Sequence, residues 1–375
     1  EAMRSHAHAI ELDTRSFGEV FKEGWHFLLP LAVLVALLIY GFTPTYAAGI
    51  SIIAVIVSSW LSKNPMKIKD IFDALAQGSR NMATTAILLV AVGLVVNVVA
   101  MTGIGNTFSL MIAEWSNGSL FIMLALVALA SLILGMGLPV TAAYIVLATL
   151  SAPALYNLIA ESHLIDLVMA GNLPEQAKVI FMLIDPEKYA LLSAPMSQAD
   201  ATALIAQVPG DFKGQLLEQA LNPTVLSAAL LSAHMIIFWL SQDSNVTPPV
   251  CLTAFAAAAI AKTPPMATGF MAWKLAKGLY IVPLLLAYTN FIGGDTPDVL
   301  RIFVFALFGL YAFVGFMEGY LEGPLNIALR VLSGVAALLM LWPHHNILID
   351  SAGLVLFIGL FIYSRKTRAA SLQTA

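Results

Sequence analysis

The stretch from Leu120 to Tyr156 carries no charged residue, and the sequence LGMGLP interrupts it near its centre. A membrane-spanning helix needs about 20 apolar residues, so this stretch is too long for one crossing, while each half is slightly short for its own. Glycine costs about 1 kcal/mol and proline about 3 kcal/mol in a helix interior. Length and interruption together predict a re-entrant hairpin over residues 120–156, which enters and leaves the membrane on one side.

The composition of the chain places it among membrane proteins. Of its 375 residues, 59% are hydrophobic and 11% charged, whereas soluble domains carry about 25% charged residues. The formal net charge of −4 argues against nucleic-acid binding. The single cysteine, Cys251, permits no internal disulfide and has no metal-ligand spacing with any histidine. We therefore predict an all-α polytopic membrane protein that holds no zinc, haem or iron–sulfur centre.

Apolar segments of suitable length predict the remaining membrane elements. One of them, 224–261, is too long for a single helix and is itself interrupted. The others are shorter and continuous, and they are expected at residues 24–41, 46–61, 82–101, 270–291, 300–318, 325–342 and 347–364.

The basic residues orient these segments, because cytoplasmic loops are enriched in lysine and arginine. With a cytoplasmic N-terminus and a hairpin at 120–156, most of the 18 basic residues fall on the cytoplasmic side. A full crossing at 120–156 would place the tail SRKTR outside, so the charge pattern favours the hairpin. If residues 120–156 were a full crossing, a second hairpin at 82–115 would also return the tail to the cytoplasmic side. The exceptions, on the outer side, are Lys178, Lys188, Lys213 and Arg301.

Polar residues divide the chain into parts with different expected roles. The insertion at 157–223 is interpreted either as a helical cap over the extracytoplasmic mouth or as a docking surface for a soluble partner. The expected parts are a cytoplasmic N-terminal segment (1–23), scaffold helices and the hairpin (24–156), an extracytoplasmic helical insertion (157–223), a broken helix and the following span (224–291), and C-terminal helices with a basic cytoplasmic tail (292–375).

A second interruption divides the apolar segment 234–261, where SQDSNVTPP separates two half-helices. Pro248 and Pro249 remove two backbone donors and do not fit a helix interior. At membrane depth, such backbone persists only where protein surrounds it or a wet cavity meets it. The second interruption is therefore expected to face the protein interior and not the lipid.

Paired interrupted segments in a transporter indicate a binding site near the membrane midplane. The free N–H groups of half-helices suit anions, and the free carbonyls suit Na⁺. We call the residues of the first interruption, Gly135 to Thr141, the first cluster and those of the second, Asp243 to Pro249, the second cluster. For either cluster taken alone, the alternative is that its glycines or prolines merely kink a packed membrane helix. The predicted substrate and ion-binding residues are Gly135, Gly137, Pro139, Thr141, Asp243, Asn245, Thr247, Pro248 and Pro249, with Na⁺ expected at Gly135, Gly137, Thr141, Asn245 and Thr247.

Two ionisable side chains in the second segment have alternative interpretations. Asp243 would be costly inside a bilayer, which makes it a candidate functional residue; it could instead lie at the watery mouth of the break. His234 is either a helix-packing residue or part of a proton relay.

Three blocks of the sequence resemble a known family. LILGMGLPVTAAYIVLATLSAPAL, DSNVTPPVCLTAFAAAAIA and PPMATGFMAWKLAKGLYIVP are similar to the fused permease subunits of tripartite ATP-independent periplasmic (TRAP) transporters, of the type that works with a TAXI-class binding protein. GFTPTYAAG resembles an FTPTEAA-like turn of this family. The likeness covers most of residues 20–291 and implies an elevator-type fold of two inverted repeats in the bacterial inner membrane.

The resemblance implies Na⁺-coupled import of a small carboxylate-bearing solute that a periplasmic TAXI-type binding protein delivers. It assigns the second-repeat hairpin tip to Gly135, Gly137, Pro139 and Thr141, and the second-repeat broken helix to Asn245, Thr247, Pro248 and Pro249.

The family's first repeat has no counterpart in the sequence. We therefore expect the C-terminal part of a permease, partnered by the N-terminal half, with no cofactor besides the coupling Na⁺. An ion channel with a filter of non-helical backbone and a non-transporting structural subunit are the rival interpretations. An enzyme is not expected, because no nucleophile, base and metal constellation is evident.

Overall fold

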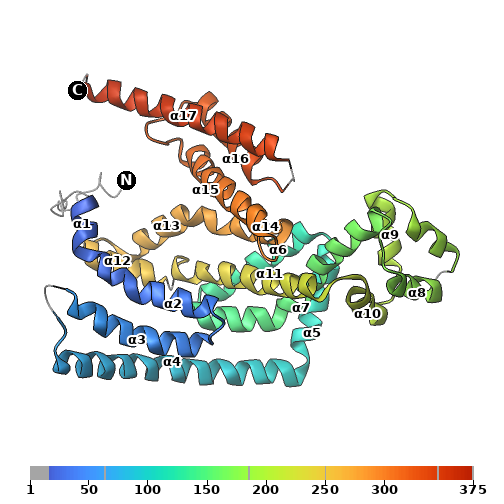
Figure 1. The fold of residues 1–375 in the computed structure, drawn as a ribbon, viewed down its shortest axis with the longest axis horizontal. Helices are drawn as coiled ribbons and strands as arrows, with labels where there is room; N and C mark the ends of the chain where they lie inside the picture. Colours follow the sequence, from blue (N-terminus) through green and yellow to red (C-terminus); the bar gives the residue numbers. More distant parts are fainter. Residues whose placement is uncertain (1–16, 63–64, 185, 250, 344–345, 374–375) are drawn as a thin grey trace. The chain divides into compact units, whose positions relative to one another are not determined.

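The computed structural model describes residues 17–62, 65–184, 186–249, 251–343 and 346–373. Helices make up most of this part of the chain, and its only strand-like pairing is an isolated bridge between Tyr320 and Pro324. Five of the helices within it are long and apolar enough to cross a membrane. The predicted all-α polytopic membrane fold is therefore confirmed (Figure 1). Most of the predicted segment 1–23 lies outside the described residues.

The contacts divide the chain into two units, Glu1–Ala91 and Val92–Ala375. In the first unit, the hydroxyl of Ser58 donates to the carbonyl of His26 and joins the third helix to the first 3₁₀ turn. The apolar helices found at Trp25–Ile39 and Pro44–Trp60 match the predicted segments 24–41 and 46–61. The elements are α1 (Phe17–Gly24), η1 (Trp25–Leu28), α2 (Leu29–Ile39) and α3 (Pro44–Trp60).

Helix α4 (Ile68–Thr102) begins well before the predicted start at residue 82. The carboxylate of Asp70 accepts a hydrogen bond from the backbone N–H of Lys67 at 2.8 Å, which satisfies one of the free donors at the helix start. The residues from 68 to 81, which precede the predicted span, are therefore helical as well. Gly103, with φ of 69°, ends α4 and leads into α5 (Ile104–Ser116).

Helices α6 (Leu120–Gly135) and α7 (Val140–Met169) lie on either side of the first interruption and pack against each other. Their lengths differ, with 16 residues in α6 and 30 in α7. Buried residues of α7 recur at helical spacing beyond residue 156, at Ala160, Leu164 and Val168. The expected boundary at residue 157 therefore lies inside α7.

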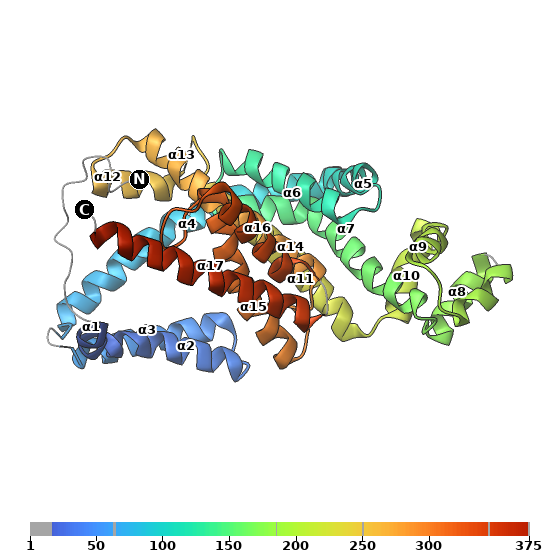
Figure 2. The same cartoon turned by 90° about the horizontal axis from the view of Figure 1, so that it is seen from above.

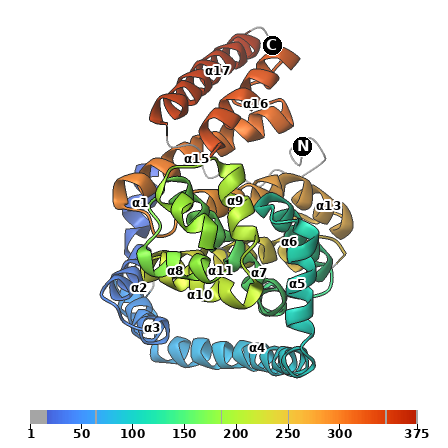
Figure 3. The same ribbon diagram turned by 90° about the vertical axis from the view of Figure 1, so that its right-hand side faces the viewer.

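A cap of short helices follows α7. In Figures 1 and 2 the cap lies at the end of α7 remote from α12 and α13. Figure 3 looks from the cap side and shows these helices in front of α7 and α11. We define the cap as α8 (Glu175–Ile184), η2 (Pro186–Ser193), α9 (Gln198–Ala206) and α10 (Gly210–Ala220).

The chain then returns along α7 and is broken twice. The second of these breaks divides the segment predicted as one span at 270–291 into two helices that are bent by 44° and that together are long and apolar enough for a single crossing. Pro283, which lacks an N–H, lies in the first turn of the second helix. The elements are α11 (Pro223–Ser241), η3 (Gln242–Asn245), α12 (Leu252–Ala261), α13 (Pro265–Leu275), η4 (Ala276–Tyr280) and α14 (Val282–Tyr288).

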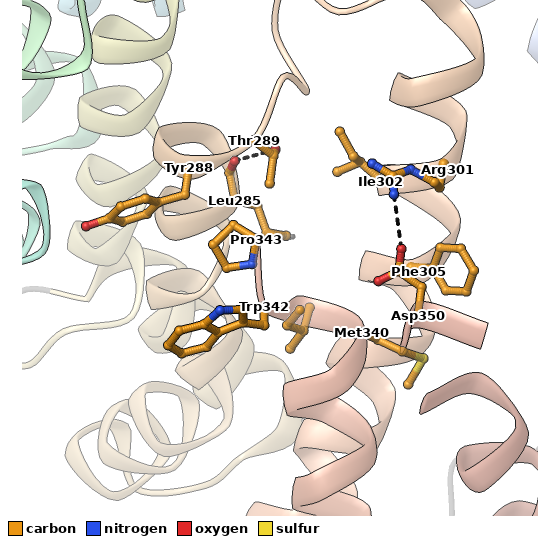
Figure 4. A pocket seen from close by; sticks show the side chains of 11 residues that line it. Leu285, Tyr288, Thr289, Arg301, Ile302, Phe305, Met340, Trp342, Pro343 and Asp350 are labelled. Atoms are coloured by element: carbon orange, nitrogen blue, oxygen red, sulfur yellow. Dashed lines mark hydrogen bonds and ion pairs between the residues drawn. The ribbon is translucent and has the colours of Figure 1, made fainter. Parts of the chain in front are cut away.

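Three C-terminal helices form a second hydrophobic core: α15 (Thr296–Glu318), α16 (Ile327–Leu341) and α17 (Ile347–Gln373). Nη1 of Arg301 lies 3.3 Å from Oδ2 of Asp350 and joins α15 to α17 (Figure 4). The predicted spans 300–318, 325–342 and 347–364 coincide with these helices.

Candidate functional site

The two predicted interruptions lie in contact. A Cβ atom added to Gly135, at the end of α6, would stand 3.2 Å from both the nitrogen and the Cα of Ser244 in η3. Such a distance is tighter than ordinary van der Waals contact, so the absence of a side chain at Gly135 permits this close approach. The same turn also packs against α7, α11 and η4. Three breaks in helical structure, around residues 136–139, 242–249 and 276–281, therefore meet at one place.

Asp243 lies inside this junction. Its side chain is only 1% exposed, and neither carboxylate oxygen has a hydrogen-bond partner within the described part of the chain. The hydroxyls of Thr247 and Tyr280 lie close to the carboxylate, but the Thr247 hydroxyl donates to the backbone carbonyl of Asp243 at 2.7 Å. A buried charge without a partner is costly, so a bound cation at Asp243 would offset a large unfavourable free energy.

Other predicted residues of the second cluster are held by local contacts. Asn245 receives a hydrogen bond from the Thr253 hydroxyl at 3.2 Å and donates to Gln242 at 3.3 Å. Thr247 is buried. Pro248 and Pro249 separate η3 from α12 and are joined by a cis peptide bond.

The residues predicted after Gly135 differ from it in exposure. Gly135 is buried, whereas Gly137, Pro139 and Thr141 are exposed. The structure therefore brings Gly135 against the second cluster and leaves the other three residues of the first cluster open on the surface of this unit.

The helices that begin at the first two breaks lack side-chain caps. Pro139 precedes α7 and Cys251 precedes α12, and neither side chain accepts a hydrogen bond from the first turn. By contrast, Asn222 caps α11 and Ser119 caps α6. Uncapped N–H groups at a helix start are suited to a negatively charged group.

Three polar side chains of the junction were absent from the predicted site. Ser131 and Tyr280 each have a buried hydroxyl with no hydrogen-bond partner among the described residues. Ser244 is the residue that contacts Gly135. Ser131 precedes Gly135 by four residues and so shares its helix face. This spacing could have indicated Ser131 from the sequence, whereas no sequence pattern indicated the bend that positions Tyr280.

His234 takes a packing position between α7 and α11. Its Nδ1 atom lies 3.1 Å from the hydroxyl of Tyr144, and the rings of Tyr144 and Phe238 meet edge to face. This hydrogen bond ties together the two helices that flank the junction.

Comparison with known families decides the identity of these elements. Residues 4–292 match the family described as "Tripartite ATP-independent periplasmic transporter, DctM component". The chain belongs to the DctM family. The predicted relationship to TRAP permeases is confirmed, and the matched range covers all three breaks of this DctM-family protein. No curated protein and no solved structure matches the chain. As a DctM component, it is a multi-pass membrane subunit of a transporter that works with a periplasmic solute-binding protein.

Proposed function

We propose that this DctM-family chain carries half of the ion and solute site of a Na⁺-coupled importer with an elevator-type fold in a bacterial inner membrane. The observation that carries the proposal is the buried Asp243 carboxylate, which lies without a hydrogen-bond partner from the described residues where three breaks meet. A monovalent cation bound by this carboxylate and the nearby hydroxyl of Thr247 or Tyr280 would neutralise the charge.

Cation binding at this place would also order the junction. Gly135 and Ser244 belong to separate breaks and already touch, so a cation that binds η3 would fix the tip between α6 and α7 as well. The solute half of the site would then be complete only when Na⁺ is bound, which is the requirement for coupling.

The uncapped starts of α7 and α12 support a solute that carries a carboxylate. Backbone N–H groups after Pro139 and Cys251 would donate to it. We further propose that the solute arrives on a binding protein of the TAXI type, and that the N-terminal half of the permease supplies the remaining contacts.

The cap is the proposed docking surface for that binding protein. Val179, Met182 and Leu183 lie on one side of α8 and are 50%, 54% and 75% exposed. Residues 157–223 also contain eight acidic residues against three lysines. An apolar patch in an acidic setting suits a partner surface with an apolar centre and a basic rim.

Transport in proteoliposomes tests the proposed function. The complete transporter should take up a small organic acid, saturably, only with an inward Na⁺ gradient and its binding protein. Thr247→Ala should weaken the Na⁺ dependence more than it lowers the expression of folded protein. A non-saturating current without the binding protein would support the channel interpretation instead, and normal Na⁺ dependence in Thr247→Ala would contradict the assigned ion site.

Leu183→Asp tests the docking surface separately. The variant should need a higher concentration of binding protein for half-maximal uptake, with an unchanged response to Na⁺. Leu300→Asp, at another exposed leucine outside the cap (61%, against 75% for Leu183), is the control. An equal effect of both substitutions would contradict docking at the cap.

A further inference from the structure

A cavity of about 570 Å³ lies between α7, α11 and α14, away from the three breaks. Gln198 of α9, the loop after α14 and Pro343 complete its wall. On α7 the lining begins at Ile159, which is 20 residues beyond Pro139 and thus about 30 Å along the helix. Small-molecule sites commonly have volumes of about 300–1,000 Å³, so this cap-end cavity has the size of a ligand site.

The cap-end cavity has an apolar floor and a polar rim. Ile159, Ala229 and Leu286 are among its lining residues and are buried. At the rim, Asp166, Gln198, Thr224 and Asn290 line the cavity and are exposed. A ligand that satisfies both parts has an apolar body and a polar end that stays near solvent.

The charges of the lining determine which polar end fits. Among the described lining residues, Asp166 is the only carboxylate and none is a lysine or arginine; His163 and Tyr288 are the other ionisable groups. Arg301 lies beyond Tyr288 and Thr289, where it lines the adjoining small cavity and pairs with Asp350 at 3.3 Å (Figure 4). A cleft of this charge attracts cations and disfavours anions.

We propose that the cap-end cavity binds a small organic cation with an apolar body, such as a protonated alkylamine. The ammonium group lies at Asp166, where it is both charge-paired and close to water, and the alkyl chain covers the floor. The site differs in chemistry from the proposed solute site, because it offers no cationic partner to a carboxylate.

Small side chains bring the wall close to α11. Gly293, in the loop after α14, has φ of +89°, and a Cβ atom added to it would lie 2.6 Å from the Cβ of Ala228. Two neighbouring residues of α11 offer positions for a test. Ala228 lines the cavity, whereas Ser227 is exposed outside the lining. A cysteine at each position therefore distinguishes occupancy of the cavity from general effects on the surface.

Thiol labelling of the purified, full-length protein tests the proposal without any need for transport. Cys251, the single native cysteine, is buried and is replaced by serine in the background variant. The labelling rates of Ala228→Cys and Ser227→Cys are then measured with a small maleimide against increasing hexylamine, hexanol or hexanoate.

Hexylamine should slow the labelling of Ala228→Cys at a concentration at least about tenfold lower than hexanoate, a difference of about 1.4 kcal/mol, and should leave Ser227→Cys unaffected. Asp166→Asn should raise the hexylamine concentration needed to that of hexanol. Equal protection by hexylamine and hexanoate, equal protection of both cysteines, or no protection of Ala228→Cys would each overturn the proposal.

Discussion

Gly135 and Ser244, which are 109 positions apart in the sequence, touch so closely that a single methyl group on Gly135 would stand 3.2 Å from the Ser244 backbone. The contact joins the tip between α6 and α7 to the 3₁₀ turn that ends α11. Because the neighbouring atoms belong to the backbone, they cannot move aside as a flexible side chain would. The approach of the two breaks therefore depends on the glycine.

Gly135→Ala should separate the breaks, whereas Gly137→Ala should not. A Cβ atom at Gly137 has no neighbour within 4 Å, which makes this variant a matched control. Overpacking typically costs about 1–3 kcal/mol, so Gly135→Ala should lower the thermal unfolding temperature and raise the Na⁺ concentration needed for half-maximal uptake. Equal behaviour of the two variants would show that the close contact has no functional role.

The Arg301–Asp350 pair should stabilise the C-terminal helices. Both side chains are mostly buried, 16% and 8% exposed, so removal of one partner leaves a buried charge. Asp350→Asn leaves Arg301 with the exposed carboxylate of Asp298, 3.7 Å from its Nε. The free energy of unfolding, measured by thermal unfolding in detergent, should therefore fall by less than the about 3–5 kcal/mol expected when a buried charge loses its only partner. The double variant Arg301→Met/Asp350→Leu should recover part of this loss.

An exposed pair provides the comparison for that measurement. Lys274 and Glu318 lie 3.9 Å apart with side chains 49% and 30% exposed, and exposed pairs contribute about 0–1 kcal/mol. Lys274→Met should therefore have a much smaller effect than Asp350→Asn. Equal losses for the two substitutions would contradict a special contribution of the buried pair.

The cap should lose stability in acid. Hydrogen bonds from Lys178 at 2.7 Å and Tyr189 at 3.0 Å lower the pKa of the Glu175 carboxyl, and the same bond to Glu175 raises the pKa of Tyr189. A lowered folded-state pKa contributes stability above the unfolded pKa of about 4, and this contribution disappears as the pH falls through the folded value.

Glu175→Gln should therefore flatten this acid response and weaken the cap at neutral pH. The ammonium of Lys178 is buried and, among the described residues, would keep only the Ser193 hydroxyl, at 3.0 Å, as a hydrogen-bond partner. Hydrogen exchange of α8 between pH 7 and pH 3 measures both effects. An unchanged pH profile in Glu175→Gln would assign the acid sensitivity to other groups.

The sequence predicted the fold class and the first two breaks because glycines and prolines inside uncharged segments have direct backbone consequences. LGMGLP separates α6 from α7, and Pro248 and Pro249 separate η3 from α12. The third break was missed, since Gly278 and Pro283 lie within a segment short enough to pass for one span. The early start of α4 was missed as well, because a polar segment gives no hydropathy signal in a membrane protein.

The surroundings of the site were less predictable than its residues. Asp243 was open to two interpretations, and the structure buries it at 1% exposure because η3 packs against α6, α7, α11 and η4. Such burial depends on contacts between segments far apart in the chain. The exposure of Gly137, Pro139 and Thr141 likewise follows from tertiary packing that no local pattern displays.

The direct test of the ion site is the effect of Na⁺ on the thermal stability of the wild-type protein and of Asp243→Asn, with choline chloride at equal ionic strength as the reference. A ligand at 100 times its Kd stabilises the folded state by about 2.7 kcal/mol. Na⁺ should therefore raise the unfolding temperature of the wild type. Asp243→Asn should be more stable than the wild type without Na⁺, because it lacks the buried charge, and should not respond to Na⁺. An equal Na⁺-dependent shift in both proteins, or none in the wild type, would contradict a cation site at Asp243.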